Sequence, residues 1–223
     1  MKINAIVAGA TGLVGSFLLK RLLEDKSFAS VTVFARRPAG LRHPSLTEHI
    51  ADFSEPSAWR HKVKGDVLFL CMGTTRAKAG GKRAQYRVDH DYQLELASAA
   101  ADNGVRAVVL VSSAGAKQGS PFFYMRMKAE VERDIQSLYP ENLSIIRPGP
   151  LTGPRREKRY AEMAGVSVIS TLNRLGLLRR YRPVHADTVA RAMVNAALKG
   201  DTGVKVYELS EVFDLAARER KSD

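Results

Sequence analysis

Cysteine is almost absent from this 223-residue sequence, whose single thiol is Cys71. One cysteine excludes an intrachain disulfide and any zinc site built from several cysteines. The five histidines are scattered without metal-ligand spacing, so we expect no metal site. Long apolar runs are also missing, and no stretch approaches the roughly 20 apolar residues that cross a bilayer. These absences predict a soluble protein of a reducing compartment, the cytoplasm, with no signal peptide and no membrane span.

Acidic residues are scarce relative to basic ones, at 23 against 35, which gives a formal net charge of +12. Such an excess suits nucleic acid, an anionic membrane or phosphorylated ligands, or simply a basic surface that keeps the protein soluble. The chain has no helix-turn-helix or aromatic-stacking motif, so nucleic-acid binding is not favoured. Apolar and charged fractions of 45% and 26% are those of an ordinary globular protein, which excludes a disordered chain.

Short apolar runs alternate with segments of helical spacing along most of the chain. The expected strands are residues 3–8, 31–35, 46–50, 67–71, 107–111, 143–146 and 204–209, and the expected helices are residues 13–23, 88–101, 122–138 and 187–198. Strands that are apolar throughout, alternating with helices, predict an α/β fold with a doubly wound parallel sheet of Rossmann type. We expect one domain over residues 1–223, with residues 151–183 as a substrate-side cap in a small C-terminal lobe and a charged, frayed tail.

A glycine-rich turn connects the first predicted strand to the first predicted helix. It contains Gly9, Thr11, Gly12, Leu13, Val14 and Gly15, and its glycines have the spacing G-x-x-G-x-x-G. Glycines at such a turn permit a tight bend and a close approach of the backbone to a pyrophosphate. The amides at the start of the following helix then face the phosphates. The strand–turn–helix context predicts a dinucleotide site.

Cofactor choice depends on the end of the second strand, where an NAD-selective site carries an acidic residue for the ribose 2′-hydroxyl. This sequence has Arg36 and Arg37 there, with no acidic residue nearby. Two guanidinium groups suit a 2′-phosphate, so we predict NADP(H), although both arginines could simply be solvated. Asp52, just after the third strand, is the expected contact for the adenine edge.

Tyr124 and Lys128 lie one helical turn apart, on the same face of a predicted helix. The neighbouring cation favours the ionised phenol, which makes Tyr124 a proton donor or acceptor for a carbonyl–alcohol pair. Ser112 and Ser113 end the fifth strand, at the edge where open α/β sheets bind ligands. A serine hydroxyl there can hydrogen-bond the substrate oxygen.

In this order the motifs resemble the short-chain dehydrogenase/reductase superfamily, in particular the atypical branch that contains the Tat-interacting-protein-like oxidoreductases. The resemblance extends from Gly9 to about Asn195. It rests on residues 9–15, 71–80, 88–92 and 111–116, on Tyr124 with Lys128, and on residues 147–149. It implies an NADPH-dependent oxidoreductase that reduces a small carbonyl compound.

The resemblance also implies residue roles. Tyr124 matches the catalytic acid/base, and Lys128 matches the lysine that holds the nicotinamide ribose. Ser113 best matches the substrate-polarising hydroxyl, with Ser112 as its rival. Cofactor contacts are implied for Met72, Gly73 and Thr74 after the fourth strand, and for residues 148–151, including Pro148 and Leu151, beside the nicotinamide. Arg155 follows closely enough to reach the cofactor.

Two features differ from the family pattern. The gap between Ser113 and Tyr124 is shorter than in many active members, and no asparagine is evident as the further catalytic partner. These differences leave open an alternative function, in which the protein binds NADPH and signals to a protein partner with little turnover.

Overall fold

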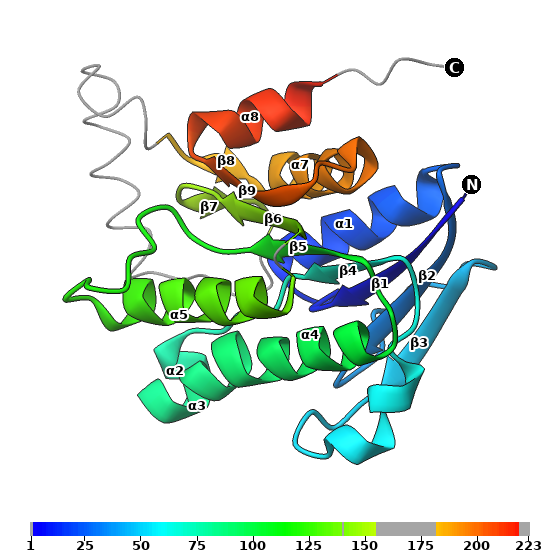
Figure 1. Cartoon of the computed structure of the whole chain (residues 1–223), viewed down its shortest axis with the longest axis horizontal. Coiled ribbons are helices and arrows are strands. Elements are labelled where there is room, and N and C mark those ends of the chain that lie inside the picture. Colours follow the sequence, from blue (N-terminus) through cyan, green and yellow to red (C-terminus); the bar gives the residue numbers. More distant parts are fainter. Residues whose placement is uncertain (1, 140, 155–181, 219–223) are drawn as a thin grey trace.

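Seven parallel strands form the central sheet of the protein, in the spatial order β3-β2-β1-β4-β5-β6-β9 (Figure 1). The computed structural model describes residues 2–139, 141–154 and 182–218. The strands of the sheet are β1 (Ile3–Ala8), β2 (Phe28–Ala35), β3 (Leu46–Ile50), β4 (Val67–Leu70), β5 (Ala107–Val111), β6 (Asn142–Arg147) and β9 (Gly203–Glu208). This order confirms the predicted doubly wound parallel sheet of Rossmann type.

Helices cover both faces of this sheet. They are α1 (Leu13–Glu24), α2 (Arg76–Ala79), α3 (Lys82–Tyr86), α4 (Tyr92–Asp102), α5 (Phe123–Leu138), α7 (Ala186–Lys199) and α8 (Ser210–Ala217), with short 3₁₀ turns η1 (Pro56–Ala58) and η2 (Arg60–Lys62). Helices α1, α7 and α8 lie on one face, and α4 and α5 lie on the other (Figure 1). A separate two-stranded sheet pairs β7 (Leu151–Thr152) with β8 (Val184–His185).

Alternate residues along the central strands pack against opposite helical layers. Val7 of β1 and Phe69 of β4 belong to the core beneath α1 and α7, whereas Ile6 and Leu68 belong to the core beneath α4 and α5. Successive side chains of a strand point to opposite faces, so a sheet covered on both sides needs apolar residues at every position. This explains why the central strands are apolar throughout.

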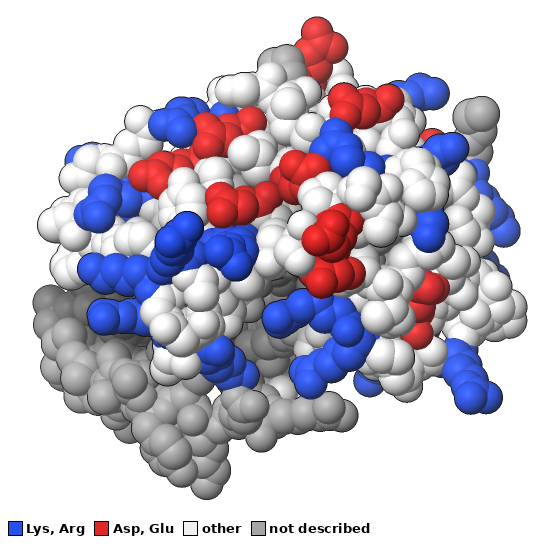
Figure 2. Space-filling model, turned by 90° about the horizontal axis from the view of Figure 1, so that it is seen from below, with Lys and Arg blue, Asp and Glu red and all other residues white. Residues whose placement is uncertain are grey.

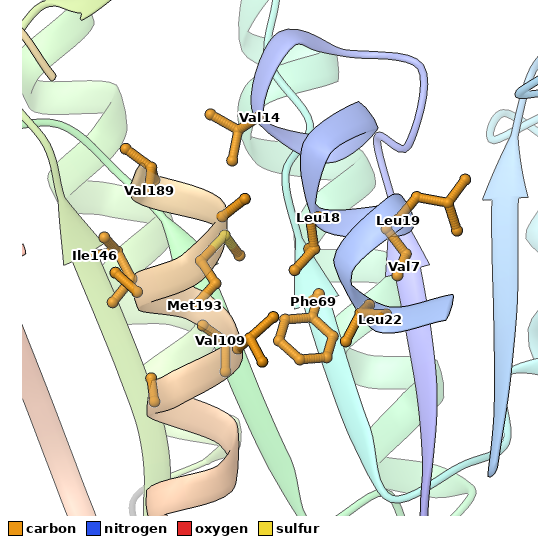
Figure 3. Packing of buried hydrophobic residues seen from close by; sticks show 14 of the residues in the cluster. Val7, Val14, Leu18, Leu19, Leu22, Phe69, Val109, Ile146, Val189 and Met193 are labelled. Carbon is orange, nitrogen blue, oxygen red and sulfur yellow. The ribbon is translucent and has the colours of Figure 1, made fainter. Parts of the chain in front are cut away.

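Helix α1 packs on the sheet through residues spaced by four. Val14, Leu18 and Leu22 are buried; Leu18 and Leu22 point toward Phe69 of the sheet, and Val14 lies on the side of α1 that faces α7 (Figure 3). This spacing places them on one stripe of the helix. The stripe fixes the start of α1, and therefore the glycine turn, above the sheet.

A bidentate ion pair joins α1 to α7 at the edge of this core. Arg21 donates from Nε to Oδ1 of Asp187 at 2.7 Å and from Nη2 to Oδ2 at 2.6 Å. The hydrogen bonds to Arg21 lower the pKa of Asp187, so the carboxylate is charged at neutral pH. The pair links two helices that are far apart in the sequence.

The structure differs from the predicted elements in two places. A π-helical segment, η3 (Arg87–Asp91), precedes α4 where one α-helix was expected over residues 88–101. Helix α8 replaces the expected frayed tail, because Val212 and Leu215 are buried while the charged Glu211 and Asp214 stay exposed. The prediction of a frayed tail was wrong because the charges lie on the exposed face of an amphipathic helix.

The expected substrate-side cap at residues 151–183 is described only at its two ends, since residues 155–181 lie outside the described ranges. The single-domain organisation over residues 1–223 therefore stays a prediction. None of the helices in the described part of the chain is long and apolar enough to cross a membrane.

Candidate functional site

The predicted site residues follow the carboxyl ends of strands that lie side by side. Because the strands are parallel, their carboxyl ends meet at one edge of the sheet. Strands β1 and β4 are neighbours, although β2 and β3 come between them in the sequence. This point, at which the strand order reverses, is where open α/β sheets bind ligands.

The glycine turn after β1 is packed too closely for side chains at two of its glycines. A Cβ at Gly9 would lie 2.6 Å from the backbone carbonyl of Cys71, and one at Gly15 would collide with the carbonyl oxygen of Gly9. Gly9 also has a φ of +89°, which favours glycine. The turn therefore needs glycine in order to bring the start of α1 against β4.

The start of α1 is open to an anion. Thr11 and Gly12 are exposed, no side chain caps the helix, and its first turn contains no acidic residue. The first amides of a helix, here those of Leu13, Val14 and Gly15, have no acceptor within the helix. This arrangement has the geometry and the charge that a pyrophosphate requires.

Strands β2 and β3 end in exposed polar residues. Arg36 and Arg37 are exposed, and neither side chain forms an ion pair with another described residue. Asp52 is exposed after β3, and its Oδ1 accepts hydrogen bonds from the amide and the hydroxyl of Ser54, at 2.9 and 2.6 Å. These bonds lower the pKa of Asp52, so it is ionised at neutral pH.

The loop after β4 is held by a buried carboxylate that the sequence analysis did not identify. Met72 is buried, Gly73 is exposed, and the amide of Thr74 donates to Oδ2 of Asp89 at 2.8 Å. Asp89 is 1% exposed. The π-helical segment η3 therefore reaches the candidate cofactor loop.

The two serines after β5 differ in accessibility. Ser112 is 4% exposed, and its hydroxyl has no hydrogen-bond partner among the described residues. Ser113 is half-buried, and its Oγ lies 3.4 Å from the carbonyl oxygen of Ala114. A bound substrate can reach Ser113 more readily than Ser112.

Tyr124 and Lys128 lie on the first turns of α5 with opposite exposure. Tyr124 is 37% exposed, whereas Lys128 is 3% exposed, and its Nζ lies 5.9 Å from the centroid of the Tyr124 ring. Burial by itself would lower the pKa of Lys128, but the Tyr124 phenol and the Asp89 carboxylate raise it, and the net pKa is above the usual lysine value. A charged ammonium therefore lies beneath an accessible phenol.

The segment after β6 lies beside both the glycine turn and the serines. The carbonyl of Pro148 accepts a hydrogen bond from the amide of Ala114 at 3.0 Å. Leu151 begins β7, and a Cβ at Gly153 would lie 3.2 Å from Leu13. The structure thus brings residues 148–151 to the predicted site, while Arg155 lies outside the described residues.

Positive charge gathers near this edge of the sheet. Figure 2 shows Lys and Arg side chains on the side of the molecule where α2 and α3 lie. The exposed basic residues of this segment are Arg76, Lys78, Lys82, Arg83 and Arg87. Lys82 Nζ lies 5.7 Å from the ring centroid of Phe123, the residue before Tyr124. A positive potential at this position attracts anionic ligands.

The thiol of Cys71 lies directly after β4 but is not a reactive group. Its sulfur lies 3.8 Å from Sδ of Met193, and burial raises the pKa of the thiol to about 12. A protonated thiol is a poor nucleophile and a poor metal ligand. Within the described ranges, His, Cys, Asp and Glu form no group of three or more that could hold a metal ion.

Comparison with known proteins assigns the chain to a family. Residues 9–200 match the family described as NAD(P)H-binding. The chain belongs to this NAD(P)H-binding family. The match begins at Gly9, the first glycine of the turn after β1, and covers each strand end described above.

Relatives of similar length share more than a third of the sequence. The protein FMP52, mitochondrial, of Saccharomyces cerevisiae is 36% identical over 225 residues, which cover 96% of each chain. The protein of the same name from Candida glabrata is 40% identical over 205 residues, which cover 89% of this chain and 86% of the relative.

Solved structures confirm the fold at lower identity. MoeE5 in complex with UDP-glucose and NAD has a TM-score of 0.68 and 21% identity, covering 96% of this chain and 81% of its own. A UDP-galactose 4-epimerase has a TM-score of 0.68 and 20% identity, covering 92% and 76%. At this identity the likeness shows the Rossmann-type fold alone. The narrower resemblance to Tat-interacting-protein-like oxidoreductases stays a prediction.

The predicted cytoplasmic location is wrong. Relatives that cover 90% or more of this chain, among them those from Saccharomyces cerevisiae, Aspergillus fumigatus and Eremothecium gossypii, are named as mitochondrial proteins. The prediction rested on a single thiol and the lack of long apolar runs, and both features are equally compatible with a mitochondrial protein.

Proposed function

We propose that this protein is an NADPH-dependent reductase of a small carbonyl compound. The observation that carries the proposal is the pairing of the accessible Tyr124 phenol with the buried Lys128 ammonium, at the sheet edge where the glycine turn offers an anion site. Membership of the NAD(P)H-binding family supports the cofactor class.

The residues at the sheet edge fit a dinucleotide. Gly9, Gly12 and Gly15 would let the pyrophosphate approach the first amides of α1, including those of Leu13 and Val14, and Thr11 would line the turn before them. Arg36 and Arg37 would hold a 2′-phosphate, because both are exposed and neither is engaged by another described side chain. Asp52 would meet the adenine edge. The nicotinamide half of the cofactor would lie against Met72, Gly73, Thr74, Pro148 and Leu151. Arg155 stays a predicted contact of the cofactor.

The chemistry divides between the cofactor and three side chains. When bound, NADPH supplies the hydride that reduces a carbonyl carbon. Tyr124 would donate its phenolic proton to the carbonyl oxygen, and the Lys128 ammonium would stabilise the phenolate that this leaves. The Ser113 hydroxyl would donate a hydrogen bond to the same oxygen as negative charge develops there. We favour Ser113 over Ser112 because the Ser113 side chain is more accessible.

A second candidate function is an NADPH-binding regulatory protein with little turnover. The observation that favours it is the lack of an asparagine alongside the serine, tyrosine and lysine, together with the short gap from Ser113 to Tyr124. The intact Tyr124 and Lys128 favour the reductase, because a protein that only binds NADPH does not need a proton donor.

The variant Tyr124→Phe tests the reductase proposal. We expect the rate of NADPH consumption against a panel of aldehydes and ketones to fall at least about 100-fold, because the proton donor is lost. The Kd for NADPH should stay within about twofold of wild type, since a general acid acts only on the reacting substrate. Tyr92→Phe is the matched control, because Tyr92 packs on Phe53 at the start of α4.

The outcomes of this experiment distinguish the reductase from the regulatory protein. Full activity in Tyr124→Phe would contradict the assigned role of the phenol. A wild-type protein that binds NADPH but consumes none of it with any carbonyl compound of the panel would favour the regulatory function.

A further inference from the structure

Asp89 is a buried carboxylate that contacts two parts of the candidate site. Its Oδ2 accepts a hydrogen bond from the amide of Thr74 at 2.8 Å, and its Oδ1 lies 3.3 Å from Nζ of Lys128. The same oxygen would lie 3.4 Å from a Cβ at Gly73. One side chain therefore touches both the loop after β4 and the lysine of α5.

The ammonium of Lys128 needs a nearby negative charge because burial disfavours an unpaired ion. The acidic groups that act on it are Asp89 of η3 and Glu132 of its own helix, and its Nζ lies 5.9 Å from the centroid of the Tyr124 ring. Glu132 is already engaged by Arg147, whose Nε and Nη2 donate to its two oxygens at 3.0 and 2.5 Å. Cys71, on the strand side, keeps its proton. Asp89 is thus the carboxylate in direct contact with Lys128.

The π-helical segment explains how Asp89 reaches this position. Two consecutive side chains of η3 contact α5: Asp89 contacts Lys128, and His90 Nε2 lies 2.9 Å from Oδ2 of Asp134. The Asp89 carbonyl also accepts a hydrogen bond from the buried Gln93 side chain at 2.5 Å. π-Helical turns occur frequently at functional sites. Here the π-helical segment places the Asp89 carboxylate between Lys128 and the Thr74 amide.

We propose that Asp89 is a positioning residue of this site, whose carboxylate holds the Lys128 ammonium and the Thr74 amide together. The lysine and the cofactor loop then keep one relative position, which a bound cofactor requires of both. This inference rests on the proposed reductase function.

The variant Asp89→Asn tests the proposal, because the amide keeps the shape and an oxygen for Thr74 but removes the charge beside Lys128. We expect kcat to fall about 10- to 100-fold as Lys128 loses its fixed position. The Asp89 carboxylate helps to raise the pKa of Lys128, and removing its charge lowers that pKa, so the alkaline limb of the kcat–pH profile should move to lower pH, by about one unit. A merely structural role would lower the rate without moving this limb.

Asp91→Asn is the matched control. Asp91 belongs to the same π-helical segment but is exposed and contacts His90 at 2.9 Å. We expect this variant to keep the wild-type pH profile. Wild-type kcat and an unmoved alkaline limb in Asp89→Asn would overturn the proposal.

Nuclear magnetic resonance on the cofactor-free protein gives a readout independent of turnover. The amide proton of Thr74 should resonate at higher field in Asp89→Asn, because its hydrogen bond to a charged oxygen becomes one to a neutral oxygen. An unchanged Thr74 resonance would overturn the contact. If instead wild type shows no turnover while the resonance moves, the reductase function fails and the contact stands.

A double variant covers the case in which Asp89→Asn unfolds because an uncompensated ammonium is left buried. Asp89→Asn with Lys128→Met removes both charges and should restore cooperative unfolding. A double variant that is no more stable than Asp89→Asn would overturn the pairing.

Discussion

The two arginines after β2 are the residues that we propose distinguish NADPH from NADH. The cofactors differ at the adenosine ribose, where NADPH has a phosphate and NADH a hydroxyl. Arg36 and Arg37 are exposed beyond the sheet edge and unpaired with other described residues, so their charges are available to a ligand. In this proposal, specificity for NADPH depends on whether these guanidinium groups bind the phosphate on the adenosine ribose.

We predict that Arg36→Asp weakens NADPH binding by about tenfold or more, because a charge-assisted hydrogen bond is lost and a like charge is added. NADH binding should be unchanged or tighter, since a carboxylate can accept from the ribose hydroxyl. Fluorescence titration of both cofactors measures the two Kd values. Arg106→Asp makes the same charge change before β5, at the opposite edge of the sheet, and should leave both values unchanged. Equal NADPH affinity in Arg36→Asp and wild type would refute this assignment.

Helices α1 and α7 are held together by one ion pair as well as by their apolar contacts. Arg21 and Asp187 are both partly buried, with 29% and 28% of their side-chain surfaces exposed. Because water reaches the pair, its contribution to stability is about 1 kcal/mol at most. At the scale of elements, this pair reports whether α7 stays docked on α1.

The coupling between Arg21 and Asp187 should depend on pH in one direction. Hydrogen bonding to Arg21 lowers the pKa of Asp187, so the stabilisation is present above the ordinary aspartate pKa and is lost as pH falls through the lower folded-state value. We predict a coupling of about 1 kcal/mol between Arg21→Met and Asp187→Asn that is constant from about pH 7 to 5 and declines below about pH 4.

Urea unfolding of wild type, the two single variants and the double variant measures this coupling. The cycle also separates the pair from any effect of Asp187 on the start of α7. Asp214→Asn on α8 is the control, because its exposed side chain has no partner among the described residues. A coupling that grew on acidification would contradict the prediction.

The features that could be predicted from the sequence are those that depend on residues close together in the chain. The central strands were predicted because a sheet covered on both faces needs apolar residues throughout, and the glycine turn because Gly9 and Gly15 leave no room for a Cβ. The role of Asp89 could not be predicted, because an aspartate in a polar helical stretch is usually exposed. Its burial depends on the π-helical turn and on α5, and α5 is distant in the sequence.

The whole molecule carries an excess of positive charge, which gathers in part on the α2–α3 side near the candidate site (Figure 2). Local positive potential favours the more highly charged of two otherwise similar ligands. The charge distribution therefore supports the proposed preference for NADPH separately from the two arginines.

We predict that NADPH stabilises the whole protein more than NADH does. At 100 times its Kd a ligand adds about 2.7 kcal/mol, which for a chain of this size raises Tm by roughly 5–10 °C. Thermal unfolding with each cofactor at equal concentration measures the difference, and adding salt should reduce it because the extra contact is ionic. Equal shifts with the two cofactors would contradict the preference for NADPH.

The unreactive thiol after β4 has a practical use. Cys71 is the single cysteine, and its proton is retained far above neutral pH. A cysteine introduced at an exposed position, such as Thr11 or Phe122, would therefore be the group that a maleimide dye or a nitroxide label selects. Pairs of such labels would report distances across the candidate site without first removing the native sulfhydryl.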